Sequence, residues 1–211
     1  MQVISVNVGL PREVMWKGKP VLTGIFKQPV KGRIEMQSLN LNGDQQADLS
    51  VHGGVEKAVY AYPSEHYAYW QKELPEADLP WGALGENLTT EGLLETGVNI
   101  GDRFRIGTAE IRVTQPRFPC FKLNLKFSRE DMVKRFLSSR LSGIYFSVMQ
   151  TGEIGAGDAL TLIHRDKHNV SVADVVKIYL READSSLVRR AIQVPALAAE
   201  LKHAFQQQLQ A

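Results

Sequence analysis

Short apolar stretches alternate with turns rich in glycine, asparagine and aspartate over most of the chain. Runs of β-branched and aromatic residues bounded by such turns predict β-strands. The expected strands cover residues 3–8, 21–26, 33–41, 58–62, 103–106, 110–114, 144–149 and 159–164. Many short strands are typical of a barrel. The pattern therefore predicts a mostly β fold with helices, of the α+β class, built around a closed β-barrel.

Helical periodicity interrupts these strands twice. The stretch 64–74 repeats aromatic and leucine side chains at helical spacing and stops before Pro75, which cannot continue a helix. A second segment opens at Ser128 and repeats apolar residues on one face up to Leu137. Both apolar faces are expected to pack against the sheet.

Beyond residue 168 the helical period continues to the end of the chain. Ser171 followed by Asp174 is typical of a helix start, and residues 185–192 predict a second helix. Pro195 fits the first turn of a third helix, whose apolar residues recur every four positions up to Leu209. This last apolar face suits packing on the two neighbouring helices or on a second copy in a homodimer.

The length and composition limit the architecture and the class of function. With 211 residues, 44% of them hydrophobic, the chain can bury an ordinary core. We expect a barrel domain over residues 1–167 and a three-helix C-terminal subdomain over residues 168–211. A net charge of +2 with dispersed lysines and arginines disfavours binding to a nucleic-acid polymer.

The same composition bears on the compartment. No apolar run approaches membrane-spanning length, and the N-terminus lacks the regions of a signal peptide. A single cysteine cannot form an internal disulfide, which suits a reducing compartment. A cytoplasmic protein that does not bind membranes is expected.

Cys120 is that single cysteine, and it lies in the segment QPRFPCFKLN. Arg117 and Lys122 flank it, and nearby positive charge favours the thiolate, the form that attacks an electrophile or binds a metal. Two prolines restrict the backbone around the thiol. The pattern indicates a reactive site. The alternative is a buried thiol that packs as a small hydrophobic side chain.

Two glycine-rich segments carry further polar groups. HGGVEK places His52 and Lys57 beside adjacent glycines, whose backbone N–H groups suit an anion such as phosphate. GALGENL carries Glu86, which can move a proton, and Asn87, whose amide matches the edge of a heterocycle. Each segment can equally be an ordinary turn or a closing loop. The histidine spacing does not support a zinc site.

In chain order, His-Gly-Gly, Gly-Glu-Asn-Leu, Gly-Asp before a strand and Gln-Pro-Arg-x-Pro-Cys-x-Lys-Leu-Asn resemble the MOSC-domain family. This family takes its name from the C-terminal domain of molybdenum-cofactor sulfurase, and its YiiM-type branch is the most similar. The resemblance covers residues 1–167, and the remaining helices look like the extension that accompanies the domain in that branch. It implies a β-barrel in which Cys120 is the protein ligand to molybdenum.

The resemblance also implies a pocket for the molybdenum–molybdopterin cofactor (Moco). Molybdopterin carries a terminal phosphate and electron-rich ring edges, which cationic and hydrogen-bonding side chains would hold. Glu86 is a candidate proton carrier, and Asp48 is a weaker candidate for the wall. The expected cofactor-binding residues are Cys120, Arg117, Lys122, His52, Lys57, Asn87, Asn124, Thr23 and Lys27.

Enzymes of this branch reduce N-hydroxylated compounds such as 6-N-hydroxylaminopurine, a detoxifying reaction. The resemblance therefore implies a molybdenum-dependent oxidoreductase that converts an N–OH group to an amine and water. The sequence carries no flavin or nicotinamide site, so an external flavoprotein or redox protein is expected to donate electrons. Two alternatives stay open. Cys120 can hold a persulfide in a sulfur-carrier or molybdopterin-handling module, or the thiol can be incidental in a ligand-binding barrel.

Overall fold

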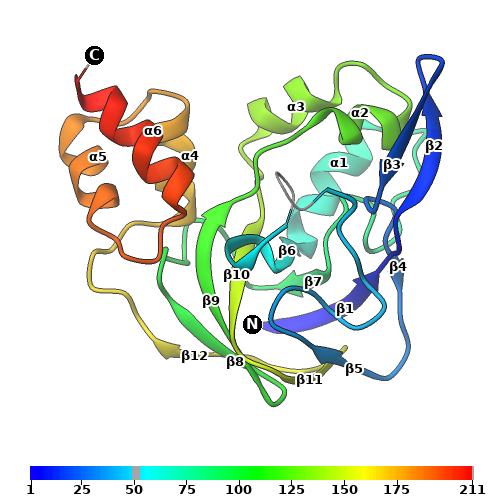
Figure 1. Cartoon of the computed structure of the whole chain (residues 1–211), viewed down its shortest axis with the longest axis horizontal. Helices are drawn as coiled ribbons and strands as arrows, with labels where there is room; N and C mark the ends of the chain where they lie inside the picture. The colour runs from blue at the N-terminus through cyan, green and yellow to red at the C-terminus, as the bar shows by residue number, and fades with distance from the viewer. Residues whose placement is uncertain (49–52, 211) are drawn as a thin grey trace.

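The computed structural model describes residues 1–48 and 53–210, and a mixed sheet of eight strands is its largest element (Figure 1). Its strands are β1 (Gln2–Val8), β4 (Gln28–Pro29), β6 (Val59–Pro63), β7 (Leu88–Glu91), β8 (Arg103–Ile106), β9 (Ala109–Pro116), β10 (Ile144–Gln150) and β12 (Leu160–His164). They are ordered β12-β8-β9-β10-β6-β7-β1-β4, and only the β6–β7 pair is parallel. The expected α+β class is confirmed.

Hydrogen bonds between the described residues do not close this sheet into the expected barrel. Its far ends meet at one isolated bridge, between Gln2 and Ala159, and at backbone bonds such as Val3 N to Asp158 O at 2.9 Å. Strand β4 pairs with Asn7 and Val8 at the other end of β1. Only the first residues of β1 are therefore left to approach β12, and no continuous ladder joins the two.

Two small antiparallel sheets flank the large one. One is the hairpin of β2 (Arg12–Trp16) and β3 (Lys19–Thr23), which stands at the edge of the molecule (Figure 1). Its turn residues Lys17 and Gly18 have φ of 50° and 76°, the left-handed conformation that tight hairpins require. The other sheet pairs β5 (Arg33–Met36) with β11 (Gly152–Gly155).

In the described part of the chain, six α-helices form two groups on separate sides of the sheet (Figure 1). The first group is α1 (Tyr67–Glu73), α2 (Phe121–Phe127) and α3 (Met132–Ser139), and the second is α4 (Val172–Tyr179), α5 (Ser185–Ile192) and α6 (Ala199–Gln210). Two short 3-10 turns, η1 (Val55–Lys57) and η2 (Ser64–His66), adjoin β6.

The C-terminal helices follow most of the sequence prediction. Ser171 and Asp174 form a reciprocal capping box at the start of α4, and α5 has the predicted bounds. The expectation for Pro195 is wrong, because Pro195 lies in a turn and α6 begins at Ala199.

Buried side chains form two hydrophobic clusters. The larger one includes Phe104 and Phe146 of the sheet together with Val175 and Phe205 of the C-terminal helices, so these helices share a core with the sheet. The division into units 1–167 and 168–211 stays a prediction.

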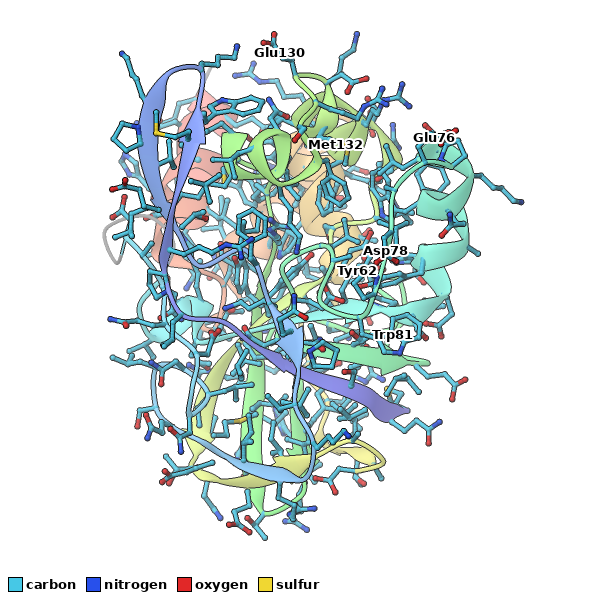
Figure 2. All side chains as sticks on the ribbon, turned by 90° about the vertical axis from the view of Figure 1, so that its right-hand side faces the viewer. Tyr62, Glu76, Asp78, Trp81, Glu130 and Met132 are labelled. Carbon is cyan, nitrogen blue, oxygen red and sulfur yellow. The ribbon has the colours of Figure 1, made fainter. Side chains whose placement is uncertain are left out.

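The smaller cluster lies between β6 and the first group of helices. Its Trp70 stacks on Phe136 with ring centroids 5.8 Å apart and donates a hydrogen bond to the Tyr62 hydroxyl at 2.6 Å. Figure 2 shows Tyr62 inside the molecule and Glu76 and Glu130 at its periphery. Within the described part of the chain, no helix is both long enough and apolar enough to cross a bilayer.

Candidate functional site

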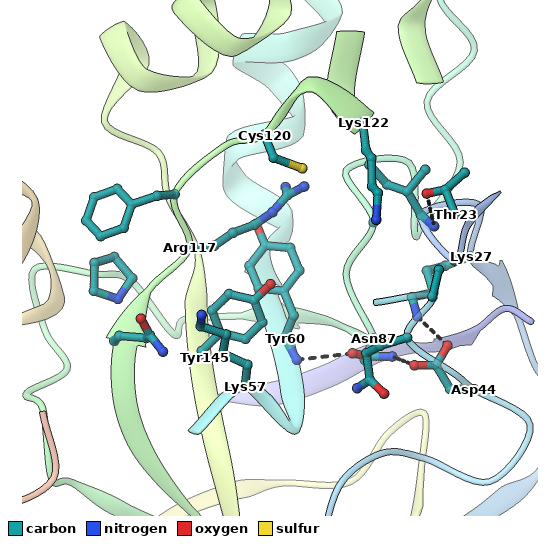
Figure 3. A pocket seen from close by; sticks show the side chains of 18 of the residues that line it. Thr23, Lys27, Asp44, Lys57, Tyr60, Asn87, Arg117, Cys120, Lys122 and Tyr145 are labelled. Atoms are coloured by element: carbon teal, nitrogen blue, oxygen red, sulfur yellow. Dashed lines mark hydrogen bonds and ion pairs between the residues drawn. The ribbon is translucent and has the colours of Figure 1, made fainter. Parts of the chain in front are cut away.

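A cavity of about 330 Å³ lies where the loop between β9 and α2 faces the segments that follow β3 and β5 (Figure 3). This volume falls within the range of small-molecule sites. Four cationic side chains line the cavity, and the C-terminal helices α4 and α6 also contribute to its wall. The cations are Lys27, Lys57, Arg117 and Lys122.

Cys120 lies on this wall and is half-buried. Its backbone is extended, with φ −129° and ψ 170°, and its carbonyl accepts a hydrogen bond from Leu123 N at 3.0 Å in the first turn of α2. Figure 3 shows the sulfur directed toward the Arg117 guanidinium and the side of the cavity where Lys122 lies. The structure therefore brings together the thiol and both flanking cations, and the thiol is not packed within either hydrophobic cluster.

Arg117 is fixed beside the thiol. It is 7% exposed, its Nη1 donates to the Leu84 carbonyl at 2.8 Å, and its guanidinium carbon lies 4.9 Å from the centre of the Tyr60 ring. Burial alone would lower its pKa, but attraction to Tyr60, Tyr145 and Cys120 raises that pKa above the ordinary value. The site therefore keeps a permanent positive charge next to the sulfur.

Lys122 contributes a second cation from the first turn of α2. It is only 8% exposed, and its ammonium makes no hydrogen bond or ion pair with any residue that the structure describes. Lys57 differs, because its Nζ lies 3.4 Å from Glu200 Oε2. Removing a charge from water without a partner is costly. The surroundings of Lys122 are therefore suited to a bound anion.

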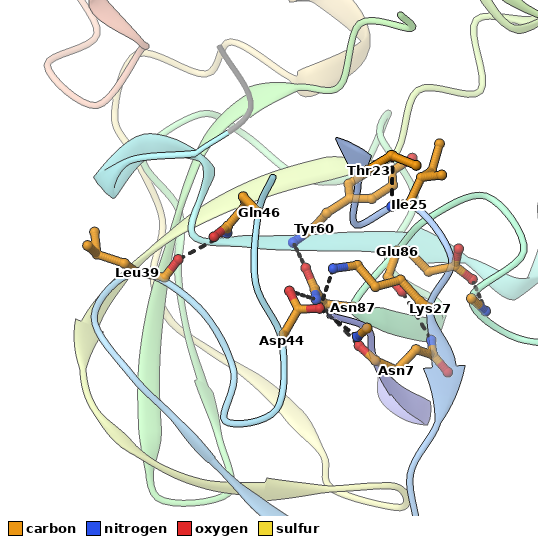
Figure 4. A network of polar contacts seen from close by, with 12 residues as sticks. Asn7, Thr23, Ile25, Lys27, Leu39, Asp44, Gln46, Tyr60, Glu86 and Asn87 are labelled. Atoms are coloured by element: carbon orange, nitrogen blue, oxygen red, sulfur yellow. Dashed lines mark hydrogen bonds and ion pairs between the residues drawn. The ribbon is translucent and has the colours of Figure 1, made fainter. Parts of the chain in front are cut away.

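Lys27 and Asn87 belong to a buried polar network (Figure 4). Lys27 forms an ion pair with Asp44, and Asn87 Nδ2 donates to the other Asp44 oxygen at 2.9 Å. Asn87 Oδ1 also accepts from Tyr60 N at 3.1 Å. Burial lowers the pKa of Lys27, although Asp44 opposes that shift. Both residues line the cavity as expected, but their polar groups already have partners that fix the wall.

Glu86 is fully buried and is not among the residues that line the cavity. Its carboxylate accepts hydrogen bonds from Gly82 N at 2.8 Å, Thr89 Oγ1 at 2.9 Å and Leu84 N at 3.1 Å, and also from the Tyr67 hydroxyl. Burial raises its pKa, and these donors partly offset the shift. The geometry favours the closing-loop alternative, and the role of proton carrier stays a prediction.

Of the remaining predicted site residues, some line the cavity and others lie away from it. Thr23 is fully buried on the cavity wall, whereas Asn124 is not part of it. The Asn124 amide instead accepts from Val133 N at 2.9 Å and donates to a loop carbonyl, so it holds the start of α3. Asp48 is exposed and is not among the lining residues. His52 lies outside the described residues.

Several lining residues were not predicted as site residues. Gln115 is 3% exposed and lies inside the cysteine segment, so its position in that segment was an available signal. Tyr179 stacks on Phe118 with ring centroids 3.9 Å apart, although its sequence indicates only an apolar helix position. The others have no local signal, because long-range folding brings them to the cavity; they include Asp44, Tyr60, Tyr145 and Glu200.

Comparisons with known proteins match this chain to one protein family and to solved structures of similar fold. A family model described as "MOSC domain" matches residues 48–161. "Protein YiiM" of Escherichia coli (strain K12) is 44% identical over 151 residues, covering 71% of this chain and 66% of that protein. A Gibberella moniliformis protein named "Reductase" is 35% identical over 182 residues, covering 84% of this chain and 32% of that protein. The crystal structure of YiiM from Geobacillus stearothermophilus has a TM-score of 0.82 at 34% identity, covering 99% of this chain and 98% of that one.

Proposed function

The chain belongs to the MOSC-domain family, and on this basis we propose that it is a molybdenum-cofactor-dependent oxidoreductase that reduces N-hydroxylated compounds to amines. One observation carries the proposal: the Cys120 thiol lies on the wall of a cavity with four cations, one of them Lys122, which is nearly buried and has no partner among the described residues. A relative named "Reductase" supports reductive chemistry.

The residues of the cavity fit the proposed cofactor. Among the residues with a described position, no group of three or more His, Cys, Asp or Glu could hold a metal ion. A single soft sulfur therefore suits a metal that arrives with ligands of its own. Cys120 would bind molybdenum, and Arg117, Lys122 and Lys57 would hold the phosphate and the electron-rich edges of molybdopterin.

When bound, the molybdenum cofactor supplies the two-electron chemistry that converts N–OH, with two protons, to an amine and one water molecule. The protein binds and orients the reactants. Burial raises the pKa of Tyr60 and of Tyr145, so both phenols stay protonated and can act only as hydrogen-bond donors or acceptors. The Tyr60 hydroxyl already donates to the Ser142 carbonyl at 3.0 Å. Tyr145 is therefore the candidate to orient the substrate N–OH group.

An external flavoprotein or small redox protein supplies the two electrons in this proposal.

The test of the proposed function uses reduced methyl viologen as the electron donor, so the natural donor need not be identified. Protein from a host that makes the cofactor is expected to convert 6-N-hydroxylaminopurine to adenine, and Cys120→Ala is expected to abolish turnover. The control is Lys134→Gln, which changes an exposed lysine of α3. Cofactor-loaded wild type without turnover would refute the proposal. Cyanide-labile sulfur on Cys120 in metal-free protein would favour the sulfur-carrier alternative.

A further inference from the structure

We infer that the C-terminal helices complete the substrate site, with Tyr179 stacking against a planar heteroaromatic ring and Gln115 donating a hydrogen bond to it. This inference rests on the proposed function, because it concerns the compound that is reduced. Through Tyr179 it assigns specificity to a part of the chain outside residues 48–161, the region that the family model matches; Gln115 lies within that region.

The cavity wall extends into those helices. Tyr179 is the last residue of α4, and Glu200 and Leu201 lie in the first turn of α6; all three line the cavity. The Lys57–Glu200 ion pair and a hydrogen bond of 3.3 Å from Ala199 N to Glu56 Oε1 hold α6 against η1. The helices therefore occupy a defined position at the site.

Tyr179 and Phe118 supply an aromatic surface close to the reactive sulfur. Their rings are stacked, with an interplanar angle of 25°, and Phe118 lies two residues before Cys120. Tyr179 is 46% exposed although it lines the cavity, so part of its ring remains open to a ligand. Aromatic faces of this kind bind planar π systems by stacking.

Gln115 supplies a side-chain N–H group that lacks a hydrogen-bond acceptor in the described structure. Its side chain is buried on the cavity wall, and its Nε2 has no hydrogen-bond partner among the residues whose positions the structure gives. Buried amide N–H groups almost always have an acceptor. A ring nitrogen of a heterocycle is such an acceptor, whereas hydroxylamine has no acceptor apart from its own N–OH group.

The aromatic surface of Tyr179 and Phe118 is distinct from the polar network of Lys27, Asp44 and Asn87. Figure 3 shows Lys27, Asp44 and Asn87 on one side of Cys120 and Tyr145 and Lys57 on the other. The Lys57 side is the one that α6 joins through Glu200. The Glu200 carboxylate at the cavity rim can accept hydrogen bonds from ring or exocyclic N–H groups.

The test compares a ring substrate with a ring-free one. Cofactor-loaded wild type, Tyr179→Ala, Tyr179→Phe and Gln115→Met are assayed with 6-N-hydroxylaminopurine and with hydroxylamine. Tyr179→Ala is expected to lower the ratio of the two kcat/KM values roughly tenfold, mainly through KM for the ring substrate. Tyr179→Phe should restore the ratio, and Gln115→Met should lower it. Tyr69→Ala, an exposed tyrosine of α1 outside the cavity, is the matched control.

Direct binding of adenine to cofactor-free protein, measured by calorimetry, separates this inference from the proposed function. Tyr179→Ala is expected to weaken adenine binding roughly tenfold. If wild type reduces neither compound, the proposed function fails, while the adenine result still tests the stacking surface. The inference is overturned if wild type does not bind adenine, if Tyr179→Ala binds it equally well, or if the variant slows both substrates to the same extent.

Discussion

Lys122 is a nearly buried cation whose ammonium meets no acceptor or carboxylate in the described part of the protein. Lys122 lines the cavity, so its positive charge, which no described carboxylate offsets, is open to a ligand that enters the cavity. A protein keeps this kind of residue where function needs it, and local stability is lower as a result. The position of Lys122 beside Cys120 is therefore best explained by an anionic ligand.

Replacing this cation should stabilise the protein and weaken cofactor binding together. For Lys122→Met we expect the free energy of unfolding of cofactor-free protein to rise by about 1 kcal/mol, because an apolar side chain replaces a cation that has no partner among the described residues. Molybdenum content should fall. Urea unfolding and metal analysis measure the two effects, with Lys134→Met on α3 as control. A less stable variant with full cofactor content would contradict this reading.

Glu86 has hydrogen bonds that give it a structural role in its loop, and its predicted role as proton carrier can be tested against that role. Its carboxylate accepts hydrogen bonds from the backbone of Gly82 and Leu84 and from two side chains, so both oxygens are committed to the loop. Glu86→Gln places an N–H₂ group opposite one of these donors. Unfolding free energy should fall by roughly 1–3 kcal/mol, and kcat per folded molecule should not change. Lower kcat with unchanged stability would instead support Glu86 as the proton carrier.

At the residue scale, the sequence predicted chemical type better than direction. Cys120, Arg117, Lys122 and Lys57 all reach the cavity, because the loop before α2, the first turn of α2 and the turn η1 all contribute to its wall. Asn124 was placed on the same wall, but a helix turns its amide toward α3. Local sequence gives the identity of a side chain, whereas the helix that forms determines where that side chain points.

Helix α2 was not predicted, because FKLNLKF alternates apolar and polar residues with the period of a strand. In the structure both Leu123 and Leu125 are buried, and so is Lys122, the residue before them. Burial on more than one side of the helix hides the usual helical pattern. The same packing brings the Lys122 ammonium inside the protein.

Lys126, near the end of α2, should make stability depend on pH. It donates hydrogen bonds to the carbonyls of Ile25 at 3.1 Å and Gly82 at 2.9 Å. Burial, together with the nearby cations and against the opposing charge of Glu86, lowers its pKa from 10.5 to about 8. Between pH 8 and 10.5 the unfolded chain therefore binds more protons at this site, and the free energy of unfolding rises with pH.

The prediction is tested by comparing wild type with Lys126→Met. From pH 7.5 to pH 10, wild type should gain roughly 1–3 kcal/mol of unfolding free energy relative to the variant. Denaturant unfolding at both pH values measures this difference. An equal pH dependence in the two proteins would show that Lys126 titrates normally.

Strand prediction succeeded where a segment carries its own pattern and failed where a partner creates the strand. Strand β8 has the predicted bounds. Strand β7 reads LTTE and was not predicted, yet it pairs with β1 on one side and β6 on the other, and its Thr89 and Thr90 are fully buried. Pairing over long range can outweigh weak local preference.

At the scale of the molecule, the C-terminal helices and the sheet share one hydrophobic cluster, which includes Phe104 and Val113 of the sheet together with Ile178 and Val188 of the helices. The two predicted units should therefore unfold together. Calorimetry of cofactor-free protein is expected to show one transition with matching calorimetric and van't Hoff enthalpies. Two separable transitions would indicate independent units.

The central claim is that Cys120 holds molybdenum in this cavity. It is tested most directly by the metal content of protein purified from a host that makes the cofactor. Wild type and Lys134→Gln should each contain close to one molybdenum per chain, and Cys120→Ala should contain little. Cys120→Ser should contain less than wild type, because oxygen is a harder ligand than sulfur. Equal molybdenum in wild type and Cys120→Ala, or none in wild type, would contradict the account.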